Sequence, residues 1–126
     1  MADYSYPMIK NALDASSMRQ RAISSNIANI NTPNYKVTKV EFEEHLKKAV
    51  KGTGLKKTHE AHLGASNPGD VVATAEKRMT TTFDENGNNV DIDLEMAEMA
   101  ANEIYYSTLI QILNAKYSKL NSVINK

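Results

Sequence analysis

The longest regular pattern in this sequence is a heptad repeat over its last third, residues 91–124. From Met96 onward, apolar or aromatic side chains recur at alternating spacings of three and four, interrupted only at Glu103. Such spacing lines side chains up along one side of a helix and is typical of a coiled-coil seam. The seam consists of Met96, Met99, Glu103, Tyr106, Ile110, Leu113, Tyr117, Leu120 and Ile124. At about 1.5 Å per residue the helix spans roughly 50 Å, which is more than a compact domain of this size needs.

Two further lines of side chains run along the same helix. One is apolar and lies about 100° from the seam; it consists of Leu94, Ala101, Tyr105, Leu109 and Ile112. The other is polar but uncharged, and consists of Ser107, Gln111, Asn114, Ser118 and Asn121. One partner helix cannot cover both apolar lines. We therefore expect the seam to pack on a helix of the same chain and the second apolar line to pack on a neighbouring copy.

A second amphipathic helix is predicted near the N-terminus, from Pro7 to about Ile30, because proline suits a first helical turn. Its seam has the same spacing, with two polar interruptions, and consists of Ile9, Leu13, Ser16, Gln20, Ile23, Ile27 and Ile30. The fold class predicted is mainly α, with the terminal helices paired as an antiparallel coiled coil. Residues 1–35 and 90–126 would form this helical core, and residues 36–89 a small, irregular middle region.

The middle region carries weaker signals. Phe42, Leu46 and Val50 fit a short amphipathic helix, and the glycines at residues 52 and 54 are expected to end it. A loop-rich stretch is expected over residues 52–70, followed by short strands at 71–74 and 79–83 and a turn at 84–87. We therefore predict one or two short β-hairpins here.

Composition excludes several classes of function. The formal net charge is zero, which disfavours general binding to nucleic acid, and the absence of cysteine excludes disulfides and thiol catalysis. No apolar run is long enough to span a bilayer, and no signal peptide is expected. The charge is nevertheless segregated, because residues 36–60 are rich in lysine while residues 84–103 hold only acidic charges. Contacts between copies and two solvated faces explain this segregation equally well.

The residues that end the first helix carry a specific resemblance. The stretch Ser25-Asn26-Ile27-Ala28-Asn29-Ile30-Asn31-Thr32-Pro33-Asn34-Tyr35-Lys36 resembles the N-terminal signature of the axial proteins of the bacterial flagellum. Asn34 stands where that signature has glycine, and asparagine tolerates similar backbone angles. Together with residues 86–95 and the terminal heptads, the chain most resembles the short proximal rod members of the flagellar basal-body rod protein family.

The resemblance implies a mechanical function. A protein of this family would be a structural subunit that polymerises helically into a hollow, torque-transmitting drive shaft of the basal body. It would be exported by the flagellar type III apparatus without a cleaved signal peptide. The implied partners are copies of itself, other proximal rod subunits, the hook–basal-body protein at the membrane ring and the export apparatus.

Three sets of residues receive roles on this basis. The assembly contacts are expected at Ile23, Asn26, Ile27, Asn29, Asn31, Tyr35, Leu94, Met99, Tyr105, Tyr106, Leu109, Ile110, Ile112, Leu113, Tyr117 and Leu120. Phe42 and Leu46 resemble the short element that engages the export gate, although core packing explains them more simply. The uncharged line defined above is a candidate lining of the channel, because a surface without fixed charge or apolar patch holds no export substrate strongly; an ordinary solvent face is the alternative.

No enzymatic, cofactor or metal site is expected. His59 and His62 are three residues apart rather than the four of a zincin helix, and no third ligand follows from the sequence. Residues 84–95 resemble a calcium-binding loop, but its sixth position, which needs glycine, is Asn89. No small-molecule substrate is implied.

Two alternatives remain open. One is a soluble cytoplasmic helical module for oligomerisation or adaptor binding, which would form a closed oligomer of one mass. The other, less favoured, is a metal-dependent enzyme that uses the histidines.

Overall fold

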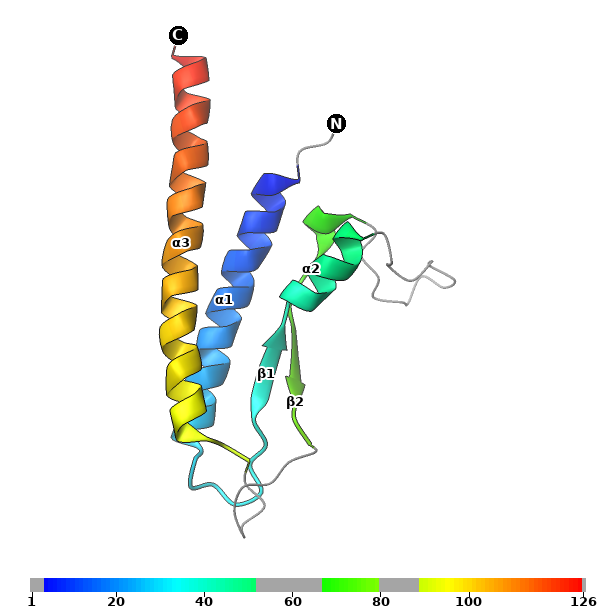
Figure 1. Ribbon diagram of the computed structural model, residues 1–126, viewed down its shortest axis with the longest axis vertical. Helices are drawn as coiled ribbons and strands as arrows, with labels where there is room; N and C mark the ends of the chain where they lie inside the picture. Colours follow the sequence, from blue (N-terminus) through cyan, green and yellow to red (C-terminus); the bar gives the residue numbers. More distant parts are fainter. Residues whose placement is uncertain (1–3, 52–66, 80–88, 126) are drawn as a thin grey trace.

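The structure is a computed structural model that describes residues 4–51, 67–79 and 89–125. Its elements are α1 (Ser5–Ala28), β1 (Thr38–Glu41), α2 (Glu43–Val50), a 3₁₀ turn η1 (Pro68–Asp70), β2 (Thr74–Lys77) and α3 (Ile92–Ile124). Figure 1 shows α1 and α3 side by side along most of α1, with the smaller elements on the other side of α1. The mainly α fold predicted from the sequence is confirmed.

The two long helices run antiparallel. Near the end of α1, the Asn26 side-chain amide donates a hydrogen bond at 3.0 Å to the Glu95 carboxylate, which lies near the start of α3. At the opposite end, the Tyr117 hydroxyl lies 3.4 Å from that of Tyr6. Because α3 has 33 residues and α1 has 24, α3 continues beyond the first turn of α1. We call this continuation, Ser118–Ile124, the overhang; it carries the C-terminal end away from the rest of the molecule (Figure 1).

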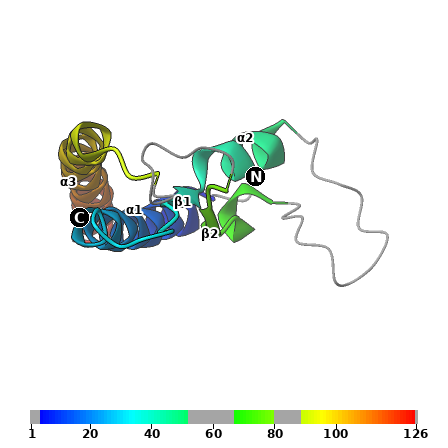
Figure 2. The same cartoon turned by 90° about the horizontal axis from the view of Figure 1, so that it is seen from below.

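The middle region packs against α1. β1 and β2 pair antiparallel, with Thr38 opposite Lys77 and Glu41 opposite Thr74. The chain from β1 to β2 passes through α2 and η1, so the strands are joined by a long excursion rather than a tight turn. Seen from below, α3 stands on one side and α2 with β2 on the other, and α1 and β1 lie between them (Figure 2).

A small apolar core joins α1, α3 and the middle region. It contains Ala12, Ala15, Phe42, Ala49, Val71 and Leu109, with Leu13, Leu46, Ala73 and Tyr105 packed at its edge. The small alanine side chains of α1 let the middle region approach this helix closely. Phe42, which is fully buried, packs in the same cluster as these alanines. Gly69 allows a similar approach, since a Cβ there would lie 3.1 Å from the Pro7 ring.

The element boundaries differ slightly from the prediction. α1 starts and ends two residues before the expected bounds at residues 7 and 30, and α2 falls where a short helix was expected. The strand predicted at residues 71–74 is shifted to Thr74–Lys77, because Val71 is 2% exposed and anchors the chain in the core before pairing begins. The predicted strand at 79–83, the turn at 84–87 and most of the loop at 52–70 lie outside the described residues.

Candidate assembly interface

The signature residues form a compact turn at the end of α1. The Asn29 side chain donates to the Ser25 carbonyl at 2.7 Å, and this carbonyl also accepts the Asn29 backbone N–H at 3.1 Å. The Thr32 hydroxyl in turn donates to the Asn29 side-chain oxygen at 3.0 Å. Asn34 has φ of 60°, the left-handed conformation in which asparagine replaces glycine with least strain. Asn34 therefore has the backbone angles expected from its place in the signature.

Asn26 has a different role, because its side chain joins three segments of the chain. Its oxygen accepts from the Tyr35 hydroxyl at 3.1 Å and from the Thr38 backbone N–H at 3.0 Å. Its amide nitrogen donates to the Thr38 carbonyl and to Glu95 Oε2, both at 3.0 Å. The residue is 1% exposed. One buried amide therefore ties α1, the start of β1 and the start of α3 together.

Asn89 performs the matching task just before α3. Its side-chain oxygen accepts from the Val37 N–H, and its amide donates to the Arg78 carbonyl, both at 2.7 Å. Two residues later, Asp91 caps α3 by accepting from the Asp93 and Leu94 N–H groups. These hydrogen bonds hold the residues before α3 to Val37, just before β1, and to Arg78, just after β2.

Glu95 is a buried carboxylate in this polar cluster. Burial raises the pKa of its carboxyl above the ordinary value, and the nearby charges of Glu98 and Asp91 raise it further. The hydrogen bond from Asn26 and the charge of Arg78 act in the opposite direction. Glu95 therefore holds its proton more tightly in the folded subunit than in the unfolded chain.

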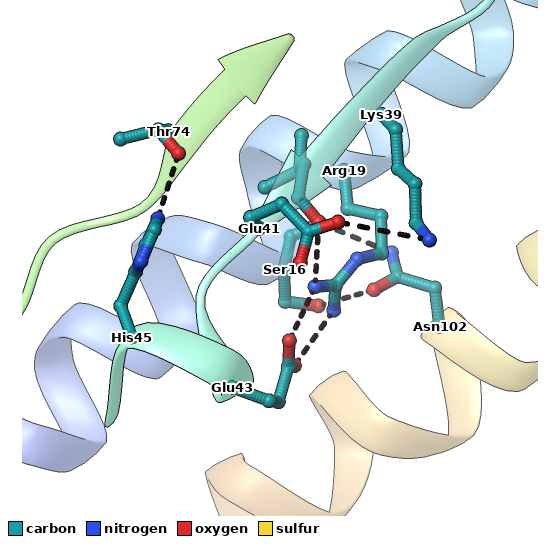
Figure 3. A network of polar contacts seen from close by, with 9 residues as sticks. Ser16, Arg19, Lys39, Glu41, Glu43, His45, Thr74 and Asn102 are labelled. Atoms are coloured by element: carbon teal, nitrogen blue, oxygen red, sulfur yellow. Dashed lines mark hydrogen bonds and ion pairs between the residues drawn. The ribbon is translucent and has the colours of Figure 1, made fainter. Parts of the chain in front are cut away.

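Polar contacts continue halfway along the helix pair. The Ser16 hydroxyl donates to the Asn102 side-chain oxygen at 3.0 Å (Figure 3). The Asn102 amide donates to the Ser16 carbonyl at 3.0 Å and to the Gln20 side-chain oxygen at 3.1 Å. Both Ser16 and Asn102 are buried. Farther along, the Lys116 ammonium donates to the Ser5 hydroxyl.

A charged cluster lies where α1 faces β1 and α2. Arg19 donates to both carboxylate oxygens of Glu43, at 3.0 and 2.7 Å, and to the Val40 carbonyl at 3.2 Å (Figure 3). Burial alone would raise the pKa of the Glu43 carboxyl, but the hydrogen bond and charge of Arg19 lower it below its ordinary value. The bidentate pair joins the start of α2 to the middle of α1.

The α3 surface that faces α1 was not the one expected. Its buried residues are Glu95, Asn102 and Leu109, spaced by seven: Glu95 and Asn102 lie between the two apolar lines predicted from the sequence, and Leu109 belongs to the second line. The assignment of Leu109 to a neighbouring copy is wrong, because this side chain is 8% exposed and belongs to the subunit's own core. The seam meets the first helix only as far as Tyr117, whose ring centroid lies 6.3 Å from that of Tyr6, and the expectation that it packs there down to Ile124 is wrong because Leu120 and Ile124 are exposed.

The predicted assembly residues therefore divide into three groups. Ile23, Asn26 and Leu109 are buried within the subunit. Ile27, Asn29, Tyr35, Met99, Tyr105, Ile110 and Leu113 are half-buried. Asn31, Leu94, Tyr106, Ile112, Tyr117 and Leu120 are exposed, as are all five residues of the uncharged line, Ser107, Gln111, Asn114, Ser118 and Asn121.

Phe42 and Leu46 belong to the folded core, Phe42 fully buried and Leu46 half-buried. His59, His62 and residues 84–88 of the calcium-like loop lie outside the described residues. In the described part of the chain no group of three or more potential metal ligands occurs. Among the described helices, none is both long and apolar enough to cross a membrane.

Sequence reasoning missed the polar residues that hold the subunit together, namely Arg19, Asn89, Glu95 and Asn102. The apolar pattern could not reveal them, because it scores polar positions as solvent-facing. The available signal was the seven-residue spacing of Glu95, Asn102 and Leu109, which places them on one side of the helix.

Comparison with known proteins yields one consistent family. The family described as flagella basal body rod protein matches residues 10–36, which include the signature turn. A flagellar basal body rod protein FlgB of Bacillus subtilis (strain 168) is 38% identical over 119 residues, which cover 92% of this chain and 89% of that protein. FlgB of Borreliella burgdorferi is 37% identical, with 89% of each chain covered. FlgB of Aeromonas hydrophila is 32% identical, with 94% of this chain and 90% of that protein covered.

Proposed function

The chain belongs to the FlgB family of flagellar basal body rod proteins, and we propose that it builds the proximal rod by helical polymerisation through α1 and α3. It is a structural subunit of the flagellar basal body and not an enzyme. It associates with its own copies and with other rod subunits. The cytoplasmic adaptor and the metal-dependent enzyme considered above are set aside by this membership.

The observation that supports polymerisation through the terminal helices is the apolar surface of α3. Its large exposed side chains are Leu94, Met96, Ile104, Tyr106, Ile112, Tyr117, Leu120, Val123 and Ile124. A monomer in solution gains nothing from exposing so many large apolar side chains, and extensive exposed apolar surface marks sites of protein association. Burying these side chains against neighbouring subunits would remove them from water and stabilise the polymer.

The uncharged line of α3 is the proposed lining of the central channel. Its five residues are exposed in the subunit. A wall without charges or apolar patches lets unfolded substrates of any composition pass. Replacing Asn114 and Ser118 by leucine should leave rods intact but reduce secretion of hook and filament protein, and wild-type secretion would contradict this lining.

Export is proposed to precede folding. The Phe42 and Leu46 side chains, which the folded subunit uses in its core, are available to an export gate only in the unfolded chain. The flagellar type III apparatus and the hook–basal-body protein at the membrane ring are the further partners proposed. No cleaved signal peptide is part of this route.

A deletion strain complemented in trans tests the function. Loss of motility with normal growth, restored by the wild-type gene, is the expected result. Leu120→Asp tests the polymer contact in the same strain, because Leu120 is 52% exposed and the substitution should leave the free subunit folded. Secretion of the variant without incorporation into basal bodies supports the proposal, and normal swimming of both the deletion strain and the variant would refute it.

A further inference from the structure

A groove runs beside the helix pair and has no occupant from the described part of the chain. α1 forms its floor, α3 one wall, and β1 with the first residue of α2 the other wall. Its volume is about 420 Å³. Several of the side chains that line it, including Arg19, Lys39 and Glu43, are shown in Figure 3. An apolar cavity of about 150 Å³ accommodates a molecule of benzene, so this groove has room for two or three large apolar side chains.

The groove combines an apolar floor with a charged rim. Nearly buried aliphatic side chains line the floor at Ile23 and the β1 wall at Val40, and the half-buried Tyr105 adds its ring from α3. At the rim, Arg19 pairs with Glu43 at 2.7 Å and Lys39 with Glu41 at 3.6 Å. Glu98 remains as the rim acid that forms no ion pair within the described part of the chain. An apolar occupant with one positive charge would complement this surface.

The overhang of α3 has this composition. Leu120, Val123 and Ile124 are 52%, 73% and 76% exposed, so within their own subunit they contact little. Lys119 lies among them, and no acidic residue follows Glu103 in the sequence. The overhang is therefore apolar and positive, whereas α3 up to Glu103 carries only acidic charge.

We propose that this groove binds the overhang of a second copy of the chain, with the apolar side chains on the floor and Lys119 beside Glu98. The inference rests on the proposed polymerisation and assigns one of its contacts. The overhang cannot reach the groove of its own subunit. Glu98 and Lys119 are on one straight helix, 21 residues and hence roughly 31 Å apart. Any coupling between these two residues must therefore pass between copies.

Charge exchange tests this contact. Glu98→Lys and Lys119→Glu should each reduce incorporation into basal bodies and motility at least tenfold, because each places like charges together at every contact. The double variant Glu98→Lys, Lys119→Glu restores opposite charges between copies and should recover most of the wild-type motility. Additive loss in the double variant, or full motility of both single variants, would overturn the proposal.

A matched control uses Glu103, an exposed acid on the other side of α3. The double variant Glu103→Lys, Lys119→Glu should show no recovery relative to Lys119→Glu alone. Recovery by this pair in place of the Glu98 pair would move the docking site to the opposite side of the helix pair and contradict the groove.

Cysteine cross-linking provides a readout that does not depend on motility, because the chain contains no cysteine. Ala101 lines the groove and Val123 lies on the overhang. In basal bodies that contain both the Ala101→Cys and Val123→Cys subunits, mild oxidation should yield a covalent dimer of about 28 kDa, twice the 14.0 kDa chain. Ser107→Cys in place of Ala101→Cys is the control and should yield at most a tenth as much dimer.

The cross-linking result distinguishes a failure of the groove contact from a failure of the proposed rod function. Basal bodies that contain the subunits but give no Ala101–Val123 dimer would overturn the groove contact while leaving the rod function intact. Basal bodies in which the chain is absent altogether would refute both. Dimer formation together with recovery in the Glu98 and Lys119 double variant is the result expected.

Discussion

The two halves of α3 differ in the side chains that they bury, although both expose large apolar residues such as Leu94 and Val123. In the first half, the residues buried against α1 include a carboxylate and an amide, Glu95 and Asn102, whereas in the second half Leu120, Val123 and Ile124 are exposed. A protein built to remain a monomer would bury the apolar residues and expose the polar ones. The difference indicates that the polar half determines how the subunit folds, and the apolar half is left for contacts beyond it.

The polar half also selects one alignment of the helices. Asn26 meets Glu95, and Ser16 meets Asn102, only in the observed register. A slide of α3 by one heptad would bring Asn102 to the place of Glu95 or the reverse, and would still leave at least one buried polar group without a partner, at a cost of about 1–3 kcal/mol for each such group. Apolar residues alone would tolerate such a slide, so the polar contacts give specificity to a seam of modest apolar content.

The largest effect on the free subunit should come from Asn26→Ala. The substitution removes four hydrogen bonds and leaves the Thr38 backbone and the Glu95 carboxylate without their partner. At roughly 1 kcal/mol for each bond, we expect the free energy of unfolding to fall by about 4 kcal/mol, measured by urea denaturation. Asn29→Ala is the control, since the two hydrogen bonds that it removes, to the Ser25 carbonyl and from the Thr32 hydroxyl, are exposed to solvent and their loss should cost less than about 1 kcal/mol in total. Equal effects of the two variants would show that the buried cluster does not hold the subunit together.

A matched pair of leucines separates folding from assembly. Leu109 is 8% exposed and Leu120 is 52% exposed on the same helix. Leu109→Ala should lower the free energy of unfolding by about 2–5 kcal/mol, as for other buried leucines. Leu120→Ala should change it by less than about 0.5 kcal/mol, yet reduce incorporation into rods. If Leu120→Ala destabilised the isolated subunit as much as Leu109→Ala, the two halves of α3 would not differ in the way described.

The sequence predicted the helices well and the contacts between them less well. The heptads, Pro7 and the asparagine-rich turn were enough to predict two long helices and their antiparallel pairing, because periodicity and helix-ending residues are local signals. Periodicity could not show which line of α3 faces α1. The two lines contain similar numbers of large apolar side chains. The subunit instead packs Glu95 and Asn102, which lie between the lines, against α1.

The polar cluster and the groove depend on residues far apart in the chain. Asn26 and Glu95 are 69 residues apart, and Val37 and Asn89 are 52 apart. No single-sequence pattern links such positions, and each asparagine is also explained locally as a turn or helix-end residue. The resemblance of the turn to flagellar axial proteins predicted the family but not the hydrogen bonds that the turn supports.

Glu95→Gln should change the pH dependence of stability. Because burial raises the pKa of the Glu95 carboxyl, its contribution to stability is fully present below the ordinary pKa of 4.5 and is lost as the pH rises through the folded-state pKa. Glutamine retains an oxygen for the Asn26 amide and cannot ionise. We therefore expect the variant to gain stability relative to wild type between pH 4 and pH 7 in urea denaturation. A constant difference over this range would contradict the account of Glu95.

Glu43→Gln serves as the control with the opposite sign. Arg19 lowers the pKa of the Glu43 carboxyl, so its contribution is present above the ordinary pKa and is lost as the pH falls through the folded-state pKa. This variant should lose stability relative to wild type as the pH rises from the lowered pKa of the folded state through the ordinary pKa of 4.5.

The smallest effect is expected at Asn34. Its φ of 60° suits glycine and asparagine, so Asn34→Gly should change the free energy of unfolding by less than about 0.5 kcal/mol. Asn34→Val should cost about 1–2 kcal/mol, because a β-branched side chain is strained in this conformation. A valine variant as stable as wild type would show that the turn relaxes and does not constrain the chain entering β1.

Amide hydrogen exchange of the overhang tests the central claim most directly, namely that α3 completes its burial on another subunit. Residues 118–124 should exchange rapidly in the free subunit, since their side chains are exposed. The same amides should be protected at least a hundredfold in purified basal bodies, while those of residues 95–109 are protected in both states. Rapid exchange of residues 118–124 in assembled rods, or full protection in the free subunit, would contradict the account.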